Sequence, residues 1–524
     1  YIVRSSLILL LLCFVGFVSA ITAQYFAARS AAGFAARVKR ALFENIQKLS
    51  YSDMDRIGTS AMITRMTSDI NQVQQGVNLT IRLLLRSPFV VFGAMFMAFT
   101  ISVRMAAIFL VTIILLFMVV GFVMTWSIPR YGQIQKKLDH LVMLTRENHT
   151  GVRVIRAFGL EDEEKERFFA DNDILMRFQR FVGNVTALMN PLTYGILNLS
   201  LAFLIYRGAV HVNAGNLTQG QVVALYNYMS QILVELIKFA NLILSVTKAI
   251  ASGNRVQDML ELEPSMKDGD IKEFENVKEV VVFDNVSMRY EGNSEDSLDG
   301  ISFTANRGER IGVIGGTGSG KSSLISLIPR FYDVFSGTVY VDGKDVRSYS
   351  IDALRERIGI VPQKAVLFHG SIRDNLKWGN KNATDEEIYE ALKLAQAKEI
   401  VDGKDKGLDH EVAQGGKNFS GGQKQRLTIA RALVKKPEIL ILDDSSSALD
   451  YLTDRNLRDA ISAMKNPPTT FIVSQRTSSV MGCDRIIVLD DGKAVGIGTH
   501  EQLLDSCETY REIYDSQFKK EDAV

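Results

Sequence analysis

The stretch RIGVIGGTGSGKSSLISLI, residues 310–328, decides the fold of the C-terminal half of this chain. It joins a strand-like apolar run, Arg310–Ile314, through the glycine-rich segment GGTGSGKS to an apolar run from Ser323 to Ile328. A strand, a glycine-rich loop and a helix in this order are typical of the phosphate-binding loop of an α/β nucleotide-binding domain. We therefore predict such a domain after the linker described below.

The chemistry expected of this loop follows from its residue types. Glycines let backbone N–H groups turn toward phosphate oxygens, Lys321 meets the β- and γ-phosphates, and the Ser322 hydroxyl reaches Mg²⁺. ATP and Mg²⁺ are therefore the expected cofactors. The candidate ATP-binding residues of this segment are Gly315, Gly316, Thr317, Gly318, Ser319, Gly320, Lys321, Ser322 and Ser323.

Two further motifs complete the nucleotide chemistry. The run ILIL at 439–442 predicts a strand that ends in Asp443, a Mg²⁺ ligand through water, and Asp444, which would face the attacking water. Between the two strands lies FSGGQ, residues 419–423, followed by a helix expected to begin near Leu427. A Ser-Gly-Gly backbone at a helix N-terminus makes a second phosphate clamp. One phosphate needs only one clamp, so we predict that two such domains face each other, each closing on the other's nucleotide.

The phosphate loop, FSGGQ and ILILDD, in this order and spacing, resemble the ATP-binding cassette domain. The resemblance implies that Tyr290 stacks on adenine and that Gln363 in IVPQ links Mg²⁺ to the membrane domain. It gives Ser322, Gln363 and Asp443 as the metal-binding set. It also implies a partner-site signature, Ser420, Gly421, Gly422 and Gln423, and an inter-site loop, Ser447, Ala448, Leu449 and Asp450.

The first half of the chain reads as membrane helices. A hydrocarbon layer of roughly 30 Å needs about 20 apolar residues in a helix. Five segments meet or approach that length, the last of them weakened by Glu235 and Lys238. They are 5–28, 87–103, 105–129, 181–206 and about 220–246.

The loops orient these predicted spans. Residues 29–86 hold nine Lys/Arg against four Asp/Glu, and residues 130–180 are similarly long and basic, which favours the cytoplasmic side for both. This orientation places Tyr1 outside, so we expect an additional helix upstream. Both loops keep helical spacing and predict hairpins that turn near 52–58 and 157–162. Solvated loops remain the alternative for these two segments.

The predicted organisation is a transmembrane domain at 1–251, a polar linker at 252–275 and an ATP-binding cassette domain at 276–524. The fold class is multi-domain: an all-α transmembrane bundle, then an α/β phosphate-loop domain with a helical subdomain. A net charge of +1 gives no reason to expect nucleic acid. The three separated cysteines, Cys13, Cys483 and Cys507, show neither metal-ligand spacing nor a disulfide framework.

Long cytoplasmic hairpins before a C-terminal cassette resemble the ABC exporters, in which each half has six spans. The segment GTSAMITRMTSDI, residues 58–70, resembles that family's first cytoplasmic loop and the start of its third span. By this resemblance, the two hairpin turns are coupling helices that dock on the cassettes, one of them on the partner's. The family's first span has no counterpart in this sequence.

Two positions depart from the family's catalytic pattern. After the magnesium aspartate the family normally has glutamate, whereas this chain has Asp444, and after the strand TFIV at 470–473 it normally has histidine, whereas this chain has Gln475. The catalytic candidates are therefore Asp444, Gln475 and Gln363, in a degenerate site. Because FSGGQ is intact, we expect a heterodimer in which this chain completes the active site of a second half-transporter with consensus residues. A slow homodimer remains the alternative.

The expected activity is ATP-driven export by alternating access, from the plasma membrane with the cassette in the cytoplasm. The expected partners besides the second subunit are membrane lipid and a small hydrophobic substrate. Lipid or peptide export and a cassette-gated channel or regulator are the alternatives; the apolar spans exclude a soluble cassette protein. Polar side chains that are candidates for the cavity are Asn190, Tyr194, Asn198, Tyr226, Asn227, Gln231 and Glu235.

Overall fold

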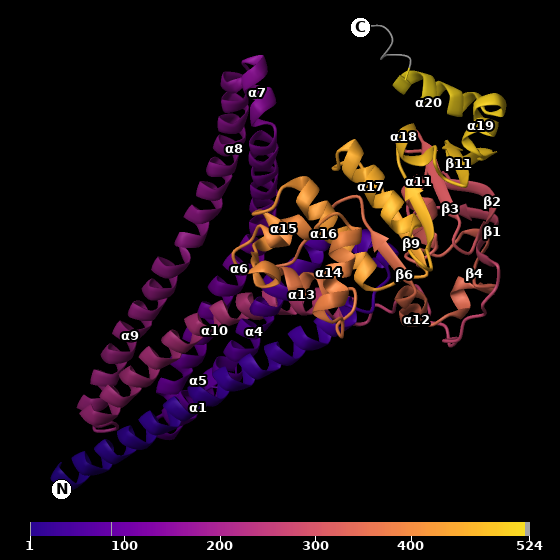
Figure 1. Cartoon of the computed structure of the whole chain (residues 1–524). Helices are drawn as coiled ribbons and strands as arrows, with labels where there is room; N and C mark the ends of the chain where they lie inside the picture. The colour runs from indigo at the N-terminus through magenta and orange to yellow at the C-terminus, as the bar shows by residue number, and fades with distance from the viewer. Residues whose placement is uncertain (1, 85, 519–524) are drawn as a thin grey trace. The chain divides into compact units, whose positions relative to one another are not determined.

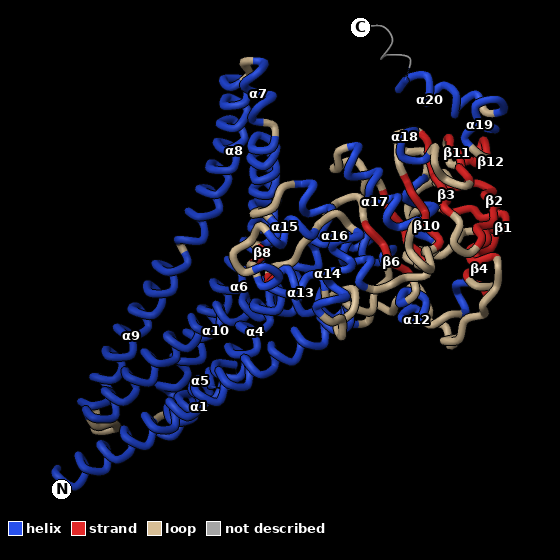
Figure 2. The backbone as a smooth tube through the Cα atoms, viewed as in Figure 1, coloured by secondary structure: helices blue, strands red, loops and turns tan. Residues whose placement is uncertain are grey.

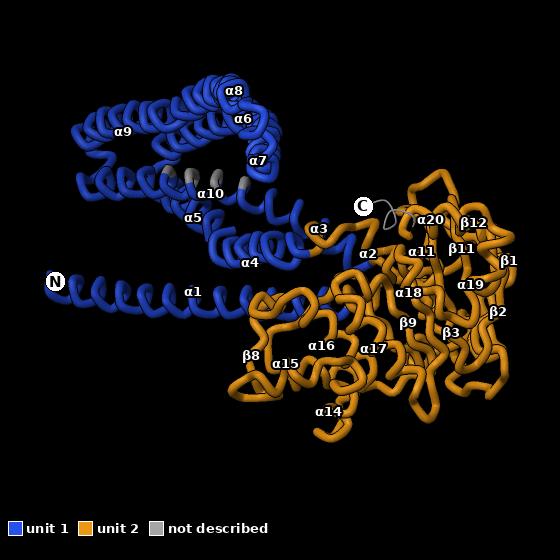
Figure 3. The backbone as a smooth tube through the Cα atoms, turned by 45° about the horizontal axis from the view of Figure 1, so that its top comes forward, with its two compact units in different colours: residues 1–44, 63–261 blue, residues 45–62, 262–524 orange. Residues whose placement is uncertain are grey.

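The computed structural model describes residues 2–84 and 86–518 and divides into two compact units. The first unit comprises residues 1–44 and 63–261, and the second comprises residues 45–62 and 262–524, as Figure 3 shows. Among the described residues the first unit is helical and the strands belong to the second (Figure 2). A short piece of the first predicted hairpin, residues 45–62, therefore belongs with the nucleotide-binding half.

Long helices dominate the chain up to residue 260 (Figure 1). They are α1 (Ile2–Ile46), α2 (Tyr51–Ile57), α3 (Thr59–Thr64), η1 (Arg65–Asp69), α4 (Ile70–Leu79), η2 (Thr80–Leu84), α5 (Arg86–Ile101), α6 (Val103–Thr150), α7 (Val152–Phe158), α8 (Glu161–Ala187), α9 (Met189–Asn213) and α10 (Gln219–Leu260). Within the first unit, α10 packs along α4, α5 and α9, and α6 packs along α8 and α9. Large apolar side chains such as Phe109, Leu204 and Leu225 are fully buried between these helices.

Four helical segments of the described chain are long and apolar enough to cross a membrane: Ile2–Ile46, Thr59–Ile101, Val103–Thr150 and Glu161–Asn213. They contain the predicted spans 5–28, 105–129 and 181–206, and all but the last two residues of the predicted span 87–103 lie in Thr59–Ile101. The fifth predicted span lies in α10, which is not among these four candidates. The helix is interrupted at Leu188: α8 ends at Ala187, and α9 begins at Met189, two residues before Pro191.

The helix α10 continues through Leu260, so residues 252–260 of the predicted linker are helical. The polar composition of this segment concealed a helical pattern, because Val256 and Met259, three residues apart, are both buried. In the first long loop, α2 ends at Ile57 and Gly58 follows. In the second, Gly159 adopts a left-handed backbone between α7 and α8, within the predicted turn.

Three sheets form the second unit. A four-stranded antiparallel sheet has the order β2-β1-β4-β5, a six-stranded sheet has the order β12-β11-β3-β10-β9-β6, and β7 pairs with β8. In the six-stranded sheet all neighbours are parallel except β12 with β11. The strands are β1 (Glu279–Met288), β2 (Leu298–Asn306), β3 (Arg310–Gly315), β4 (Ser336–Val341), β5 (Lys344–Asp345), β6 (Ile358–Val361), β7 (Gly370–Ser371), β8 (Glu411–Val412), β9 (Ile439–Asp443), β10 (Thr469–Val473), β11 (Arg485–Asp490) and β12 (Lys493–Gly498).

Helices cover the larger sheet, and α13 to α16 form the predicted helical subdomain beside β6 (Figure 1). The helices of this unit are α11 (Lys321–Leu327), η3 (Val346–Ser348), α12 (Ile351–Glu356), α13 (Ile372–Leu376), α14 (Asp385–Leu394), α15 (Lys398–Asp402), η4 (Gly407–Asp409), η5 (Gln414–Gly416), α16 (Gly421–Val434), α17 (Tyr451–Ser462), α18 (Thr477–Val480), α19 (His500–Ser506) and α20 (Glu508–Phe518). The central strands β3, β9 and β10 are parallel and adjacent, so their carboxyl ends share one edge of the sheet.

Candidate functional site

The phosphate loop joins β3 to α11 as the sequence predicts. Gly316, Thr317 and Gly318 are exposed, whereas Lys321 is only 9% exposed. The Lys321 Nζ donates to the carbonyls of Gly315 and Gly316 at 3.0 and 2.5 Å. Burial lowers the pKa of Lys321, and the carboxylates of Asp443 and Asp444 oppose that shift. The loop therefore curls around a buried cation.

Glycine is required at position 320 of this loop for two reasons. Its backbone has a φ of +94°, a conformation that side chains with a Cβ rarely adopt. An added Cβ would also lie 2.7 Å from the carbonyl oxygen of Ser297. No atom lies within 4 Å of a Cβ built on Gly316 or Gly318, so open space faces the loop there.

The two aspartates at the carboxyl end of β9 approach the loop across β10, which lies between β3 and β9. Ser322 donates its hydroxyl to Asp443 Oδ1 at 3.2 Å, and Gln363 Nε2 donates to Asp444 Oδ2 at 3.4 Å. Burial raises the pKa of Asp443, with a further contribution from Asp444, while the Ser322 hydroxyl and Lys321 act in the opposite direction. The predicted metal-binding residues Ser322, Gln363 and Asp443 thus lie at the same edge of the sheet as Asp444.

Asp444 has a left-handed backbone with φ of +42°. Aspartate and asparagine adopt this conformation more readily than most residues. The Asp444 N–H donates to the Val473 carbonyl at 3.0 Å, and the Ser447 hydroxyl donates to the Asp444 carbonyl at 2.8 Å. The first of these bonds ties the end of β9 to the end of β10.

Gln475 lies two residues beyond β10, and its side chain is exposed. In the register of the sheet, Val473 pairs with Asp443. Asp444 and Gln475, the two departures from the family pattern, therefore follow neighbouring strand ends on the same edge.

Tyr290 follows β1 and is half-buried. Its hydroxyl is 3.0 Å from the Ser323 hydroxyl, at the start of α11. Its ring meets the ring of Tyr332 edge to face, with centroids 5.2 Å apart. The predicted adenine-stacking residue is thus held next to the phosphate loop.

The helix α16 begins at Gly421, six residues before the predicted start near Leu427. Ser420 is its N-cap: the Ser420 hydroxyl accepts from the Gln423 N–H at 3.3 Å, and the Gln423 side chain accepts from the Ser420 N–H at 3.0 Å. The two glycines hid this capping box, because glycine has a poor helix propensity. Ser420 and Gly421 are exposed, which leaves the N-terminus of α16 accessible to an anion.

The predicted inter-site loop lies beside this helix start. A Cβ added to Gly422 would be 3.1 Å from the Ala448 carbonyl, so a small residue suits that position. Leu449 is buried, and Asp450 is the N-cap of α17, accepting from the Thr453 N–H at 2.9 Å. Ser447 and Ala448 are exposed.

These residues fit ATP and Mg²⁺. The hydroxyl of Ser322 and the carboxylate of Asp443 supply the oxygen donors that Mg²⁺ prefers, 3.2 Å apart on adjacent elements. The open space over Gly316 and Gly318 can admit phosphates without displacing a side chain.

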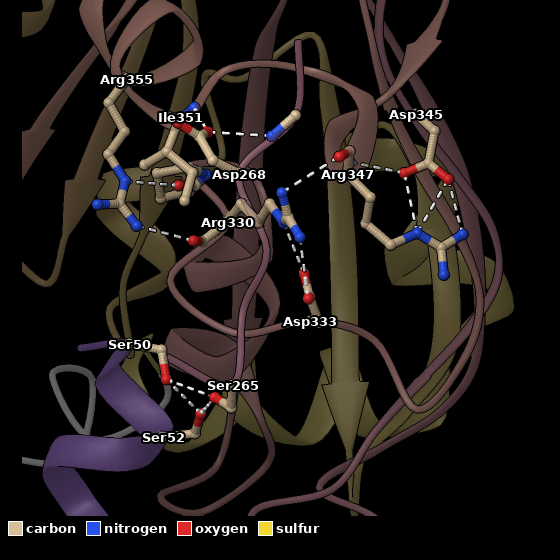
Figure 4. Close-up of polar contacts among 12 residues, drawn as sticks. Ser50, Ser52, Ser265, Asp268, Arg330, Asp333, Asp345, Arg347, Ile351 and Arg355 are labelled. Carbon is tan, nitrogen blue, oxygen red and sulfur yellow. Dashed lines mark hydrogen bonds and ion pairs between the residues drawn. The ribbon is translucent and has the colours of Figure 1, made fainter. Parts of the chain in front are cut away.

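Sequence analysis did not identify the contacts of α2 within the second unit. The Ser50 hydroxyl lies 2.7 Å from that of Ser265 (Figure 4). The buried Asp53 accepts from the Ser265 N–H at 3.0 Å. Burial acts to raise the pKa of Asp53, but hydrogen bonds from Ser50 and Ser265 outweigh it and lower the pKa. The signal available was the capping box that Ser50 and Asp53 form at the start of α2.

Aromatic side chains extend this docking. The rings of Tyr51 and Phe331 lie 4.5 Å apart, and the Tyr332 hydroxyl donates to Asp55 Oδ2 at 2.7 Å. Burial and the Asp55 carboxylate raise the pKa of Tyr332, so it stays a neutral donor. Tyr332 thus contacts both Tyr290 and α2.

Polar residues of the predicted cavity divide into two groups. Asn190, Tyr194, Asn198, Tyr226, Asn227 and Gln231 are exposed in the chain. Glu235 is 4% exposed; it accepts from the Ser87 hydroxyl at 2.9 Å and from Lys238 at 3.0 Å. Glu235 therefore links α10 to α5.

Comparison with protein families gives two matches. The family model of the ABC transporter transmembrane region matches residues 1–236, and that of the ABC transporter matches residues 298–447. By structure, the chain is similar to a bacterial Atm1-family ABC exporter with ATP bound: the TM-score is 0.78 at 24% identity, covering 94% of this chain and 86% of the other.

Three curated relatives cover nearly the whole chain. The uncharacterized ABC transporter ATP-binding protein YfiB of Bacillus subtilis is 36% identical over 95% of this chain and 86% of its own length. The putative multidrug export ATP-binding/permease protein YgaD of the same organism is 32% identical over 94% and 85%. The ATP-dependent lipid A-core flippase of Syntrophus aciditrophicus is 30% identical over 93% and 81%.

Proposed function

The chain belongs to the ABC transporter family, and from that premise we propose that it is the degenerate-site subunit of a heterodimeric exporter. Its membrane helices would carry substrate by alternating access, and α10 would be a further span. Its cassette would bind ATP at its own phosphate loop while hydrolysing it slowly. Its signature residues would complete the faster site of a second subunit.

One observation carries this proposal: Asp444 and Gln475 follow adjacent strands on one edge of the sheet. The carboxylate of Asp444 is one methylene shorter than glutamate, so it would fall about 1 Å or more short of the water, and such a misplacement can cost about a hundredfold in rate. Gln475 can donate a hydrogen bond to a phosphate oxygen but cannot carry a positive charge. Both differences weaken the same catalytic step.

The remaining residues of this site support tight binding. Lys321 is buried beneath the phosphate loop, and its ammonium would exchange the carbonyls of Gly315 and Gly316 for phosphate oxygens. Ser322 and Asp443 would hold Mg²⁺, and Gln363 lies beside them at Asp444. Bound Mg²⁺ supplies neutralisation of the phosphate charge. Tyr290 would present its ring to adenine.

The surface offered to the partner keeps the complete family pattern. The exposed start of α16 presents backbone N–H groups and its positive dipole end to the nucleotide of the other subunit. The Ser447 hydroxyl bonds to the carbonyl of Asp444, so the inter-site loop touches the degenerate site and flanks the signature.

For the substrate we propose a small hydrophobic molecule, exported across the plasma membrane, with the cassette in the cytoplasm. A lipid is the second candidate, because a relative that is 30% identical is named a lipid A-core flippase. Transport into vesicles of a labelled lipid and of a hydrophobic dye would separate the two candidates.

The first test is the mass and identity of everything that copurifies with this chain from its native membrane in mild detergent. A stoichiometric second subunit with glutamate and histidine at the two departed positions is the expected result. Recovery of this chain alone would refute the heterodimer, and a homodimer with two slow sites would take its place.

A further inference from the structure

The loop that follows β10 is held by its backbone. Ser474 is fully buried, and its N–H donates to the Val313 carbonyl of β3 at 3.1 Å. The Ser474 hydroxyl accepts from the Arg476 N–H at 3.0 Å. These bonds fix the beginning of the loop and leave the Gln475 carbonyl and the Thr477 N–H to be satisfied elsewhere.

A single side chain from the C-terminal helix satisfies both groups. Gln517 Nε2 donates to the Gln475 carbonyl at 2.8 Å, and Gln517 Oε1 accepts from the Thr477 N–H at 2.9 Å. Thr477 begins α18, and the preceding Arg476 makes no side-chain capping bond. Gln517 therefore serves as the missing cap of α18 and clamps the backbone on either side of Arg476.

The position of Gln517 is itself determined by the core. Tyr510 is fully buried, and its hydroxyl lies 2.7 Å from His500 Nδ1. Tyr510 and Gln517 are seven residues apart on α20, so they lie on the same face of the helix. The helix α20 contacts α18, as Figure 1 also shows. The buried Tyr510 thus fixes the position of α20 along and around its axis, and with it the position of Gln517.

From this geometry we infer that Gln517 is a positioning residue of the ATP site, holding the backbone of Gln475 so that the exposed Gln475 side chain faces the terminal phosphate. The inference rests on the proposed function, in which ATP binds at this edge of the sheet. As a consequence, a displacement of α20 would shift the backbone of Gln475 through Gln517, without any direct contact between α20 and the nucleotide.

The test uses Gln517→Ala and Gln517→Glu in the intact transporter, with Glu512→Gln, on an exposed position of the same helix, as the control. Hydrogen exchange followed by mass spectrometry reports on the Thr477 amide. Photolabelling of this chain with an azido-ATP gives half-saturation at its own site, and steady-state kinetics give kcat and KM for the complex. The alanine variant should exchange the Thr477 amide about tenfold faster or more. Its half-saturation by the ATP analogue should rise about three- to tenfold.

Gln517→Glu separates positioning from a loss of structure. It keeps the acceptor for the Thr477 N–H and loses the donor to the Gln475 carbonyl, so it should restore Thr477 protection and recover only part of the labelling affinity. Wild-type Thr477 exchange in the alanine variant would overturn the inference. Faster exchange with an unchanged labelling curve would also overturn it.

If hydrogen exchange shows that Gln517→Ala also loosens β3 and β9, Gln517→Glu becomes the deciding variant, because glutamate has the same shape as glutamine. A wild-type labelling curve in Gln517→Glu then overturns the inference. Rapid hydrolysis at this chain's own site would refute the proposed asymmetry of the two sites. It would leave the inference about Gln517 standing, since Thr477 exchange is measured without turnover.

Discussion

The two candidate phosphate-binding surfaces of the cassette differ in how they are built. The phosphate loop surrounds a buried lysine and faces two carboxylates from β9, whereas the signature surface is an exposed helix start with a self-satisfied capping box. By the resemblance described above, the first surface differs from the family's motif at Asp444 and Gln475, whereas the second matches the motif. A chain that hydrolysed only its own ATP would need the first surface more than the second.

The difference teaches how, in the proposed function, binding and hydrolysis would use separate residues at one edge of the sheet. Lys321, Ser322 and Asp443 match the family's motif, and in the proposed function they bind phosphate and metal. Only the residues that would act on the attacking water and on the terminal phosphate differ. The predictions below alter each surface in turn.

The largest effect is expected on the signature surface. Gly421→Asp places a carboxylate at the exposed start of α16, where the partner's phosphates would lie. Repulsion and loss of the backbone anion site should reduce ATP turnover of the whole complex about a hundredfold or more. Steady-state ATPase activity of the purified complex measures this loss.

Gly482→Asp is the matched control, because Gly482 is exposed and no atom lies within 4 Å of its added Cβ. It should leave turnover near the wild-type value. Wild-type turnover in Gly421→Asp would show that this surface does not serve a competent site.

Restoring the family residues in the other surface should produce the next largest effect. The double change Asp444→Glu and Gln475→His should raise hydrolysis at this chain's own site by about ten- to a hundredfold, because the carboxylate gains about 1 Å of reach. Vanadate trapping of an azido-ATP, quantified separately on each subunit, measures the site of turnover.

A glutamate in a left-handed backbone could be strained for reasons unrelated to catalysis. Asp491 provides the control, since it has φ of +44° outside the site. Asp491→Glu should leave vanadate trapping unchanged. Any loss of stability that it causes measures the strain of placing a glutamate in a left-handed backbone, which Asp444→Glu shares. If trapping on this chain stays low in the double variant, Asp444 and Gln475 do not explain the slow site.

A smaller effect is expected where the nucleotide site meets α2. Tyr332→Phe removes the bond to Asp55 and keeps the ring beside Tyr290. Losing one hydrogen bond to a charged group should reduce substrate-stimulated turnover by about fivefold and leave nucleotide affinity unchanged. Tyr340→Phe on β4, in the same unit, is the control, and a parallel loss of nucleotide affinity would contradict this assignment.

Sequence reasoning located the parts of the site that local pattern determines. The elements β3, β9 and β10 lie where their apolar runs predicted them. The start of α16 was wrong by six residues, because two glycines obscured a capping box. The linker boundary was early, because buried Val256 and Met259 lie among polar residues.

Long-range contacts gave no such signal. The bonds of Gln517 to the loop after β10 span about 40 residues, and those of Ser265 to α2 span more than 200. Hydrogen bonds between a side chain and a backbone group so far away along the chain leave no periodic pattern in sequence, since glutamine and serine are common at exposed positions as well. Only the three-dimensional structure identifies which glutamine and serine residues form such bonds.

The smallest effect is expected on the thermal stability of the protein, through Asp443, the candidate magnesium ligand. Burial and the neighbouring Asp444 raise the pKa of Asp443 above its ordinary value of 3.8, so the ionised form is less stable in the folded protein than in the unfolded chain. The contribution of Asp443 to stability is therefore most favourable below that ordinary value and is lost as the pH rises through its folded-state pKa. Asp443→Asn removes the charge and should raise the melting temperature of the metal- and nucleotide-free complex at pH 7, by about 2–4 °C for each kcal/mol gained.

The same substitution should abolish the stabilisation expected of the wild-type protein with Mg²⁺ and ATP, because the carboxylate proposed to hold the metal is lost. Differential scanning calorimetry with EDTA, and then with Mg²⁺ and ATP, measures both effects. The gain over wild type should shrink as the pH is lowered through the raised folded-state pKa of Asp443, where the carboxylate takes up its proton. A gain that is constant with pH would show that packing, and not the buried charge, sets the stability of this end of β9.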